Sequence, residues 1–313
     1  MVQSFLQLNS IFISLVIEAV PFIVVGVFIS AIIQIFITEE MIAKFIPKNR
    51  FFSILLGTCM GSLFPACECG IVPITEGLVR KKVPLHAAIA FMLTGPIINP
   101  IVIFATYVAF GNSWEMVIRR CSLAIVVAFI VGLLISYLFN DDQLREFLNK
   151  KAQKAQSQAN KKKHHHHHHD HEHIHSMTAM EKVKEMIDHA LDEFFSVGKF
   201  LVIGAFIAAS MQVFVKTSTL SLLGHTTATS ILVMMLLAFL LSLCSEADAF
   251  IASSFRGTFA TGSLTAFLVF GAMVDIKNLI MMLSTFKKRF VFTLIGSITV
   301  VVFIGSLFGS LFL

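Results

Sequence analysis

The residues best suited to chemistry lie in one short motif, PACECGIVP, at residues 65–73 of a hydrophobic stretch. Thiolates are soft ligands for zinc, copper(I) or a trivalent metalloid. A carboxylate at membrane depth is costly unless it is paired or hydrated, and it is therefore a functional candidate. We predict that Cys67, Glu68 and Cys69 take part in substrate binding, with buried structural cysteines as the alternative for the two thiols.

A second group of the same kind, Cys244-Ser245-Glu246-Ala247-Asp248, lies in a later hydrophobic stretch. If both groups face one cavity, Cys244, Glu246 and Asp248 join the binding set, which then suits a cationic or thiophilic substrate or a proton relay. The alternative is that the two carboxylates cap a helix at the membrane edge, where Arg256 is close enough in sequence to neutralise one of them.

Helix-breaking residues accompany these groups. We expect broken helices at 65–73 and at 94–100, because proline and glycine end or kink helices. Asn99 offers an amide to a substrate or belongs to a plain hinge. Asp275 is its counterpart later in the chain, and Asp275 has Lys277 or Lys81 as a candidate partner. The expected helix-breaking residues are Pro65, Gly70, Pro73, Gly95, Pro96 and Pro100.

The elements that must position these residues are hydrophobic helices. Of 313 residues, 56% are hydrophobic and 14% charged, against about 25% charged in an average soluble domain. This excludes a disordered chain, a coiled coil and an ordinary cytosolic enzyme. We predict an all-α membrane protein with about eight transmembrane helices in two related four-segment halves, since a span needs about 20 apolar residues. The runs are 11–37, 51–79, 84–110, 121–139, 194–215, 229–255, 262–284 and 290–313.

The two halves resemble each other. Residues 22–37 align with 200–215 at a constant offset that also places Glu68 on Glu246. We interpret this as duplication rather than a chance match of apolar runs. Four simple spans in each half would make the repeats parallel, whereas a re-entrant hairpin in each half would make them inverted. A hairpin at residues 51–79 would put the basic residues on both sides of it on the cytoplasmic face.

The chain divides into a first transmembrane repeat at 1–139, a soluble, charged linker at 140–192 and a second transmembrane repeat at 193–313. The linker contains a histidine tract that binds zinc or another divalent metal when neutral; a purification tag is the alternative, but the tract is internal and continues beyond six histidines. We expect the linker to be cytoplasmic. The tract consists of His164, His165, His166, His167, His168, His169, His171, His173 and His175.

Two parts of the chain resemble the predicted permease family that includes the organoarsenical efflux permeases. The first is ACECGIVPITEGLVRKKVPLHAAIAFMLTGPIINP (66–100), and the second is CSEADAFIASSF (244–255) together with AFLVFGAMVDIKN (266–278). The resemblance implies an eight-span plasma-membrane permease; some members export trivalent organoarsenicals, and others accompany a second membrane subunit and are linked to metals. The family's cysteine motif falls on Cys67 and Cys69, and its second motif on Gly95, Pro96, Asn99 and Pro100. Glu68 departs from the usual C-S-C-G pattern and favours a metal cation.

These observations predict an integral membrane permease, a secondary transporter that moves a metal or metalloid species across the plasma membrane. Its partners are the lipid bilayer, a small ion or metalloid and a second membrane subunit, with no role for nucleic acid. We expect no enzymatic activity, because the sequence has no Walker loop, G-x-S-x-G elbow or H-E-x-x-H motif. The alternatives are efflux of organoarsenicals or another small organic solute, and a non-transporting membrane subunit or metal sensor.

Overall fold

The computed structural model describes residues 2–36, 46–47, 49–64, 67–139, 143–144, 179–214 and 226–312. Within these ranges the chain is helical, and its β-structure is limited to one isolated bridge between Leu144 and Phe286. The prediction of an all-α membrane protein is confirmed. The histidine tract and Pro65 lie outside the described residues.

The first half contains α1 (Val2–Phe36), α3 (Arg50–Leu63), α4 (Glu68–Arg80), α5 (Leu85–Thr94), α6 (Pro100–Ala109) and α7 (Trp114–Leu138). The second half contains α9 (Ala179–Phe214), α11 (Thr227–Leu241), α12 (Ser245–Ser254), α13 (Thr261–Met273), α14 (Ile276–Thr285) and α15 (Lys288–Phe312). Each half therefore has a long helix at either end and four short helices between them. All eight predicted hydrophobic runs are helical in the described residues, and α9 begins within the range expected for the linker.

Five segments among the described residues are long and apolar enough to cross a membrane, namely 5–33, 114–138, 186–213, 261–285 and 288–310. The apolar helices α3, α5, α6 and α11 are shorter. Four hydrophobic runs are therefore divided into helix pairs, and the divisions fall near the residues with candidate chemistry.

The expected break at 65–73 is narrower in the structure. Phe64 and Cys67 have extended backbones between α3 and α4, but Gly70 and Pro73 lie inside α4, which continues to Arg80. The prediction that these two residues break the helix was therefore wrong. A proline removes one backbone donor, so the Cys69 carbonyl lacks its usual helical partner. The rest of α4 keeps its hydrogen bonds and packs as a buried helix, which outweighs that loss.

The break at 94–100 follows the prediction. α5 ends at Thr94, Gly95 follows it, and α6 begins at Pro100. The Asn99 side chain caps α6 by accepting a hydrogen bond from the Val102 amide at 2.9 Å, and Pro100 suits the first helical position because its missing amide is not needed there.

The second half makes its corresponding break without proline. Val274 and Asp275 have extended backbones between α13 and α14. Asp275 caps α14 by accepting from the Asn278 amide, as Asn99 caps α6. A side-chain cap is therefore common to both breaks, while the prolines are particular to the first half.

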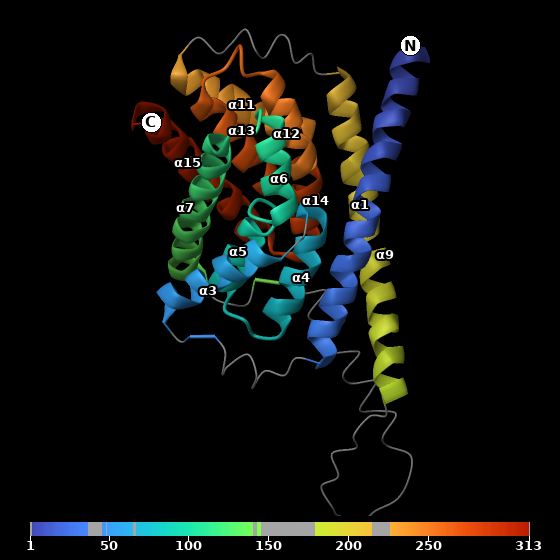
Figure 1. Ribbon diagram of the computed structural model, residues 1–313. Coiled ribbons are helices and arrows are strands. Elements are labelled where there is room, and N and C mark those ends of the chain that lie inside the picture. Colours follow the sequence, from blue (N-terminus) through green and yellow to red (C-terminus); the bar gives the residue numbers. More distant parts are fainter. Residues whose placement is uncertain are drawn as a thin grey trace, which may run out of the picture.

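The helix pairs enter the bundle from opposite ends. Figure 1 shows the start of α3 and the end of α4 at the end of the bundle where α7 finishes and α9 begins, which we call the linker end. α11 begins and α12 finishes at the opposite end. Each pair thus turns back inside the bundle as a re-entrant hairpin.

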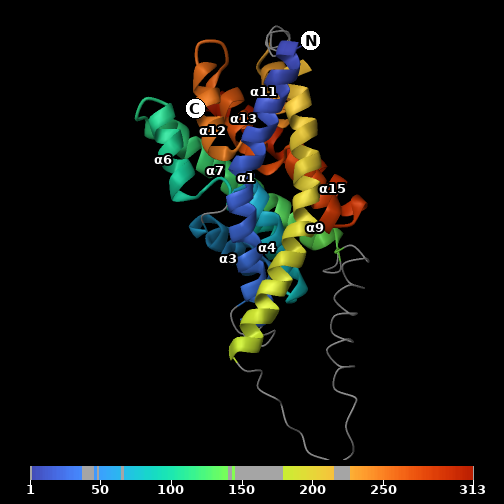
Figure 2. The ribbon, with the colours of Figure 1, turned by 90° about the vertical axis from the view of Figure 1, so that its right-hand side faces the viewer.

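Two long helices, α1 and α9, run side by side along one flank of the bundle (Figure 2). α1 packs on α4, and α9 packs on α14. The contact with α4 is close, since a Cβ atom on Gly26 would lie 2.6 Å from the Gly70 carbonyl oxygen. Glycine at both positions lets the two backbones meet and supports the first hairpin from behind.

Candidate functional site

The turn of the first hairpin, Cys67–Cys69, which we call the α4 tip, is buried. Cys67 precedes the first residue of α4, and Glu68 occupies the first helical position. The exposed fractions of Cys67, Glu68 and Cys69 are 2%, 1% and 4%. The amides at a helix N-terminus favour a carboxylate, yet Glu68 Oε1 has no hydrogen-bond partner in the described structure.

The turn of the second hairpin, Cys244–Asp248, which we call the α12 tip, meets the α4 tip. Ser242 ends α11 in the left-handed conformation, and Cys244 precedes α12. The Cys244 thiol donates to Glu246 Oε2 at 3.0 Å and lies 3.8 Å from Glu68 Oε2. The structure thus brings together residues 176 positions apart in the sequence.

Three thiols gather where the tips meet. The Cys67 thiol lies beside those of Cys69 and Cys244, and all described cysteines are free. Even so, the described residues contain no group of three His, Cys, Asp or Glu side chains placed to hold a metal ion. The arrangement offers soft, adjacent sulfur atoms next to a carboxylate without a ready-made three-ligand metal centre.

A buried lysine stands beside the α4 tip. Lys277, at the second position of α14, has its ammonium nitrogen 3.7 Å from Asp275 Oδ2, and both side chains are buried. Lys277 is also the cation that interacts most strongly with Glu68. The prediction that Asp275 pairs with Lys277 or Lys81 is thereby resolved in favour of Lys277. Because Asp275 also caps α14, its position is fixed by the helix that presents the lysine.

A buried arginine, which sequence reasoning missed, stands beside the α12 tip. Arg120 is 1% exposed and donates to Thr106 Oγ1 at 2.8 Å and to the Ser245 carbonyl at 3.2 Å. Asp248 is the carboxylate that interacts with it most strongly. Arg256, which the helix-cap alternative offered as a partner for one of these carboxylates, donates to the Phe110 carbonyl.

The position of Arg120 follows from the true start of its helix. The sequence interpretation began the fourth run at Cys121, whereas α7 begins at Trp114. A periodicity could have found the arginine, because Met116, Val117, Arg120, Leu123 and Ala124 are buried at the spacing of one helical face. Counted as part of that stripe, Arg120 points into the bundle.

Unpartnered polar atoms concentrate at the two tips. Nearly all buried polar groups in proteins have hydrogen-bond partners, and leaving one without a partner costs about 1–3 kcal/mol. Such a concentration indicates a place where water, an ion or a polar ligand completes the hydrogen bonding. The atoms around the tips without a hydrogen-bond partner in the described residues are Glu68 Oε1, Arg120 Nε, Ser245 Oγ, Asp248 Oδ2, Asn278 Oδ1 and Asp275 Oδ2, the last of which has only its ionic contact with Lys277.

The other predicted binding residues have defined places. Asn99 is buried, and both ends of its amide are engaged: Oδ1 caps α6, and Nδ2 donates to the Gly95 carbonyl at 3.4 Å. This geometry supports the hinge interpretation of Asn99. Glu246 is partly exposed, whereas Asp248 is buried, so the two carboxylates of the α12 tip have different surroundings.

Comparison of the sequence with known proteins identifies a family of similar proteins. A family model described as "Predicted permease" matches residues 4–310. The UPF0718 protein YcgR of Bacillus subtilis is 60% identical over 305 residues, which cover 97% of each chain. A "Putative two-component membrane permease complex subunit" of Streptococcus mutans is 44% identical over 302 residues, covering 96% of this chain and 94% of the relative. No solved structure matches the chain.

Proposed function

The chain belongs to this predicted permease family, and on that premise we propose that it is a secondary transporter that moves a metal or metalloid species across the plasma membrane. One observation carries the proposal: the two hairpin tips meet inside the bundle and bring three thiols together with Glu68 and Glu246. Thiols select soft cations and trivalent metalloids, and the carboxylates favour a positive charge. A proton gradient is the proposed driver, because no nucleotide-binding motif is present in the sequence.

The two halves are proposed to be inverted repeats. The order of helix lengths recurs, each half has a side-chain-capped break, and the two hairpins enter from opposite ends of the bundle. Transporters with inverted repeats bind substrate near the bilayer midplane, where discontinuous helices end. The α4 and α12 tips are helix ends of this kind.

The linker end is proposed to be cytoplasmic. Arg80 ends α4, and Lys81 and Lys82 form the turn after it; Lys287 lies in the turn before α15, and Lys288 is the first residue of that helix. Cytoplasmic loops carry an excess of basic residues, and both turns lie at the linker end. The histidine tract would then meet cytoplasmic metal, where it buffers zinc or another divalent ion.

Efflux of a monosubstituted arsenical is the second candidate. The observation that favours it is the lack, in the described part of the chain, of a three-side-chain metal centre. A trivalent arsenic that already carries one carbon substituent needs fewer protein ligands than a bare ion, and adjacent thiols supply them. A second membrane subunit is also proposed, supported by the printed name of the Streptococcus mutans relative.

Flux in vesicles tests the function. Purified protein in proteoliposomes would be given Zn²⁺, Cu⁺ or methylarsenite with and without a pH gradient. We expect Cys67→Ser, Cys69→Ser and Glu68→Gln to abolish movement of the transported probe. Cys59→Ser is the matched control, because Cys59 is an exposed thiol away from the tips.

The outcomes separate the candidates. Flux of Zn²⁺ or Cu⁺ supports the metal, flux of methylarsenite alone supports the arsenical, and unchanged flux in all three tip variants removes the site assignment. If no probe moves while deletion of residues 161–175 abolishes a metal response of the cell, the chain is a sensor rather than a transporter.

A further inference from the structure

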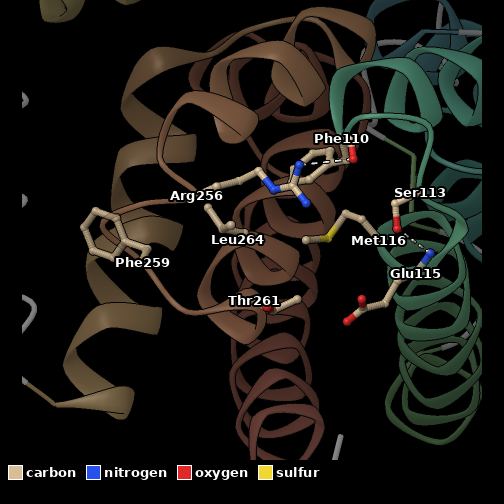
Figure 3. A pocket seen from close by; sticks show the side chains of 8 residues that line it. All are labelled: Phe110, Ser113, Glu115, Met116, Arg256, Phe259, Thr261 and Leu264. Atoms are coloured by element: carbon tan, nitrogen blue, oxygen red, sulfur yellow. Dashed lines mark hydrogen bonds between the residues drawn. The ribbon is translucent and has the colours of Figure 1, made fainter.

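A pocket of about 80 Å³ opens at the end of the bundle opposite the linker end, where the helices that line it begin or finish in Figure 1. Figure 3 shows its lining side chains from close by. One wall comes from the turn between α6 and α7 and the start of α7, and the other from the turn between α12 and α13 and the start of α13. The pocket therefore lies between the two halves. Its lining consists of Phe110, Ser113, Glu115, Met116, Arg256, Phe259, Thr261 and Leu264.

The floor of this pocket is close to the α12 tip. Met116 lies one helical turn before Arg120 on α7, a rise of about 6 Å. On α13, Gly271 faces the tip, since a Cβ atom there would lie 3.1 Å from Asp248 Oδ2. The helices that line the pocket therefore also contact the charged residues beneath it.

One polar contact crosses the floor of the pocket, within a cluster of buried apolar side chains. The Thr265 hydroxyl lies 3.6 Å from Met116 Sδ, which joins α13 to α7 across the floor. Both residues are 5% exposed. A thioether and a hydroxyl form a weak contact that a change of side-chain conformation can open. This contact is neither covalent nor ionic.

A second contact joins the two walls near the surface. Arg256 donates from Nη1 to the Phe110 carbonyl at 3.1 Å, and its guanidinium lies 5.2 Å from the centre of the Phe110 ring. Gly111 lies beside the arginine in the left-handed region, with φ +71, which favours glycine. Figure 3 shows the arginine reaching across the pocket to the phenylalanine.

The linker end is packed differently. The Lys287 amide donates to the Gln143 carbonyl at 2.9 Å, next to the bridge between Leu144 and Phe286. The ring of Phe290 contacts Phe139 and Phe286 at centroid distances of 5.2 and 5.4 Å, and Phe286 and Phe290 are fully buried. A backbone hydrogen bond and two ring contacts, one edge-to-face and one tilted, tie the end of α7 to the start of α15.

We propose that the pocket between Phe110 and Leu264 is the outer mouth of the permeation pathway, with Met116 and Thr265 as its gate and Arg256 as the latch that holds its two walls together. The inference rests on the proposed transport function. The soft thioether of Met116 at the gate suits the same thiophilic cargo as the thiols beyond it. In this structure buried side chains, Met116 and Thr265 among them, close the mouth.

Thiol labelling tests the mouth without any transported substrate. Full-length protein with Cys59→Ser and Cys121→Ser would be placed in proteoliposomes and treated with a membrane-impermeant methanethiosulfonate on either side. Met116→Cys reports the gate. Val117→Cys is the matched control, because Val117 is equally buried on the same helix and does not line the pocket. Leu264→Cys is a second reporter from the opposite wall, used if the Met116 variant does not fold.

We expect Met116→Cys to label several-fold faster than Val117→Cys, only from the side opposite the linker, and faster again when Arg256→Ala is added. Equal labelling of the two cysteine variants, or labelling from the linker side, overturns the proposal. If labelling is as expected but no probe is transported in the flux assay, the proposed transport function is rejected, while the pocket is still shown to be an opening on this side of the protein. If flux depends on the tip residues but Met116→Cys is not labelled faster than Val117→Cys, the assignment of the mouth is rejected and the transport function is kept.

Discussion

The α4 tip and the α12 tip occupy corresponding places in the two halves, yet they are held by different cations. The α4 tip faces Lys277, which comes from the second half, and the α12 tip faces Arg120, which comes from the first. Each hairpin thus has a buried cation of the opposite half acting on it. The charge pairing ties the halves together where their hairpins meet.

The two cations also differ in how firmly they are held. Arg120 makes two hydrogen bonds to two helices, while Lys277 makes one ionic contact at 3.7 Å. Neither has a charged counterpart at the same helical position of the other half, where Leu294 and Ile101 stand. The hydrogen bonds of Arg120 therefore anchor the α12 tip, and the α4 tip is the more adjustable of the two.

Removal of the anchor should have the largest effect. Arg120→Met leaves the Thr106 hydroxyl and the Ser245 carbonyl without their donor. It also removes the buried positive charge that acts on Asp248, and leaving a buried charge uncompensated in this way costs about 3–5 kcal/mol. Unfolding of the purified protein by denaturant in lipid nanodiscs would measure this. The control is Arg119→Met, which removes a more exposed pair with Glu115 and should cost at most about 1 kcal/mol. Equal losses in the two variants would contradict the anchor.

Removal of the looser cation should cost less. Lys277→Met leaves Asp275 Oδ2 without its ammonium but keeps the cap on α14, so we expect a loss of about 2 kcal/mol in the same assay. The control is Lys288→Met, because Lys288 is exposed at the start of α15. Asn278→Leu is unsuitable as a control, since it removes the hydrogen bond to the Met273 carbonyl. A loss larger than that of Arg120→Met would reverse the comparison.

The next largest loss of stability is expected at the contact between α1 and α4, behind the α4 tip. Gly26→Ala puts a methyl group against the Gly70 carbonyl at 2.6 Å, and overpacking of this kind costs about 1–2 kcal/mol. Gly198→Ala, where nothing lies within 4 Å, should instead be neutral or stabilising by up to about 1 kcal/mol, since alanine favours the helix. Thermal unfolding of both variants would measure the contrast, and identical shifts would rule out the close helix contact.

The smallest effect is expected at the paired helix breaks. Asn99→Ala removes only a helix cap and should cost about 1 kcal/mol. Asp275→Ala removes a cap and the partner of Lys277, so it should cost clearly more. Denaturant unfolding of the two variants side by side checks this order. Equal losses would mean that the Lys277 contact adds nothing to stability.

Much of the fold could be predicted from the sequence. Long apolar runs require helices because a bilayer leaves backbone groups without water partners, and Pro96 and Pro100 mark a break that the structure has. The residues of both tips are visible as polar groups in apolar stretches. The extent of the first break was not predictable, because Pro73 breaks a helix or is tolerated in it according to what packs around it.

The pattern of apolar and polar residues alone predicts a helical membrane protein with two internal groups of candidate binding residues. Only the tertiary structure decided that the two groups meet, that each run around them turns back as a hairpin, and that Arg120 faces inward. The physical reason is that hydrophobicity fixes which residues leave water, whereas the partner of a buried charge depends on helices that lie far apart in the sequence and close together in space.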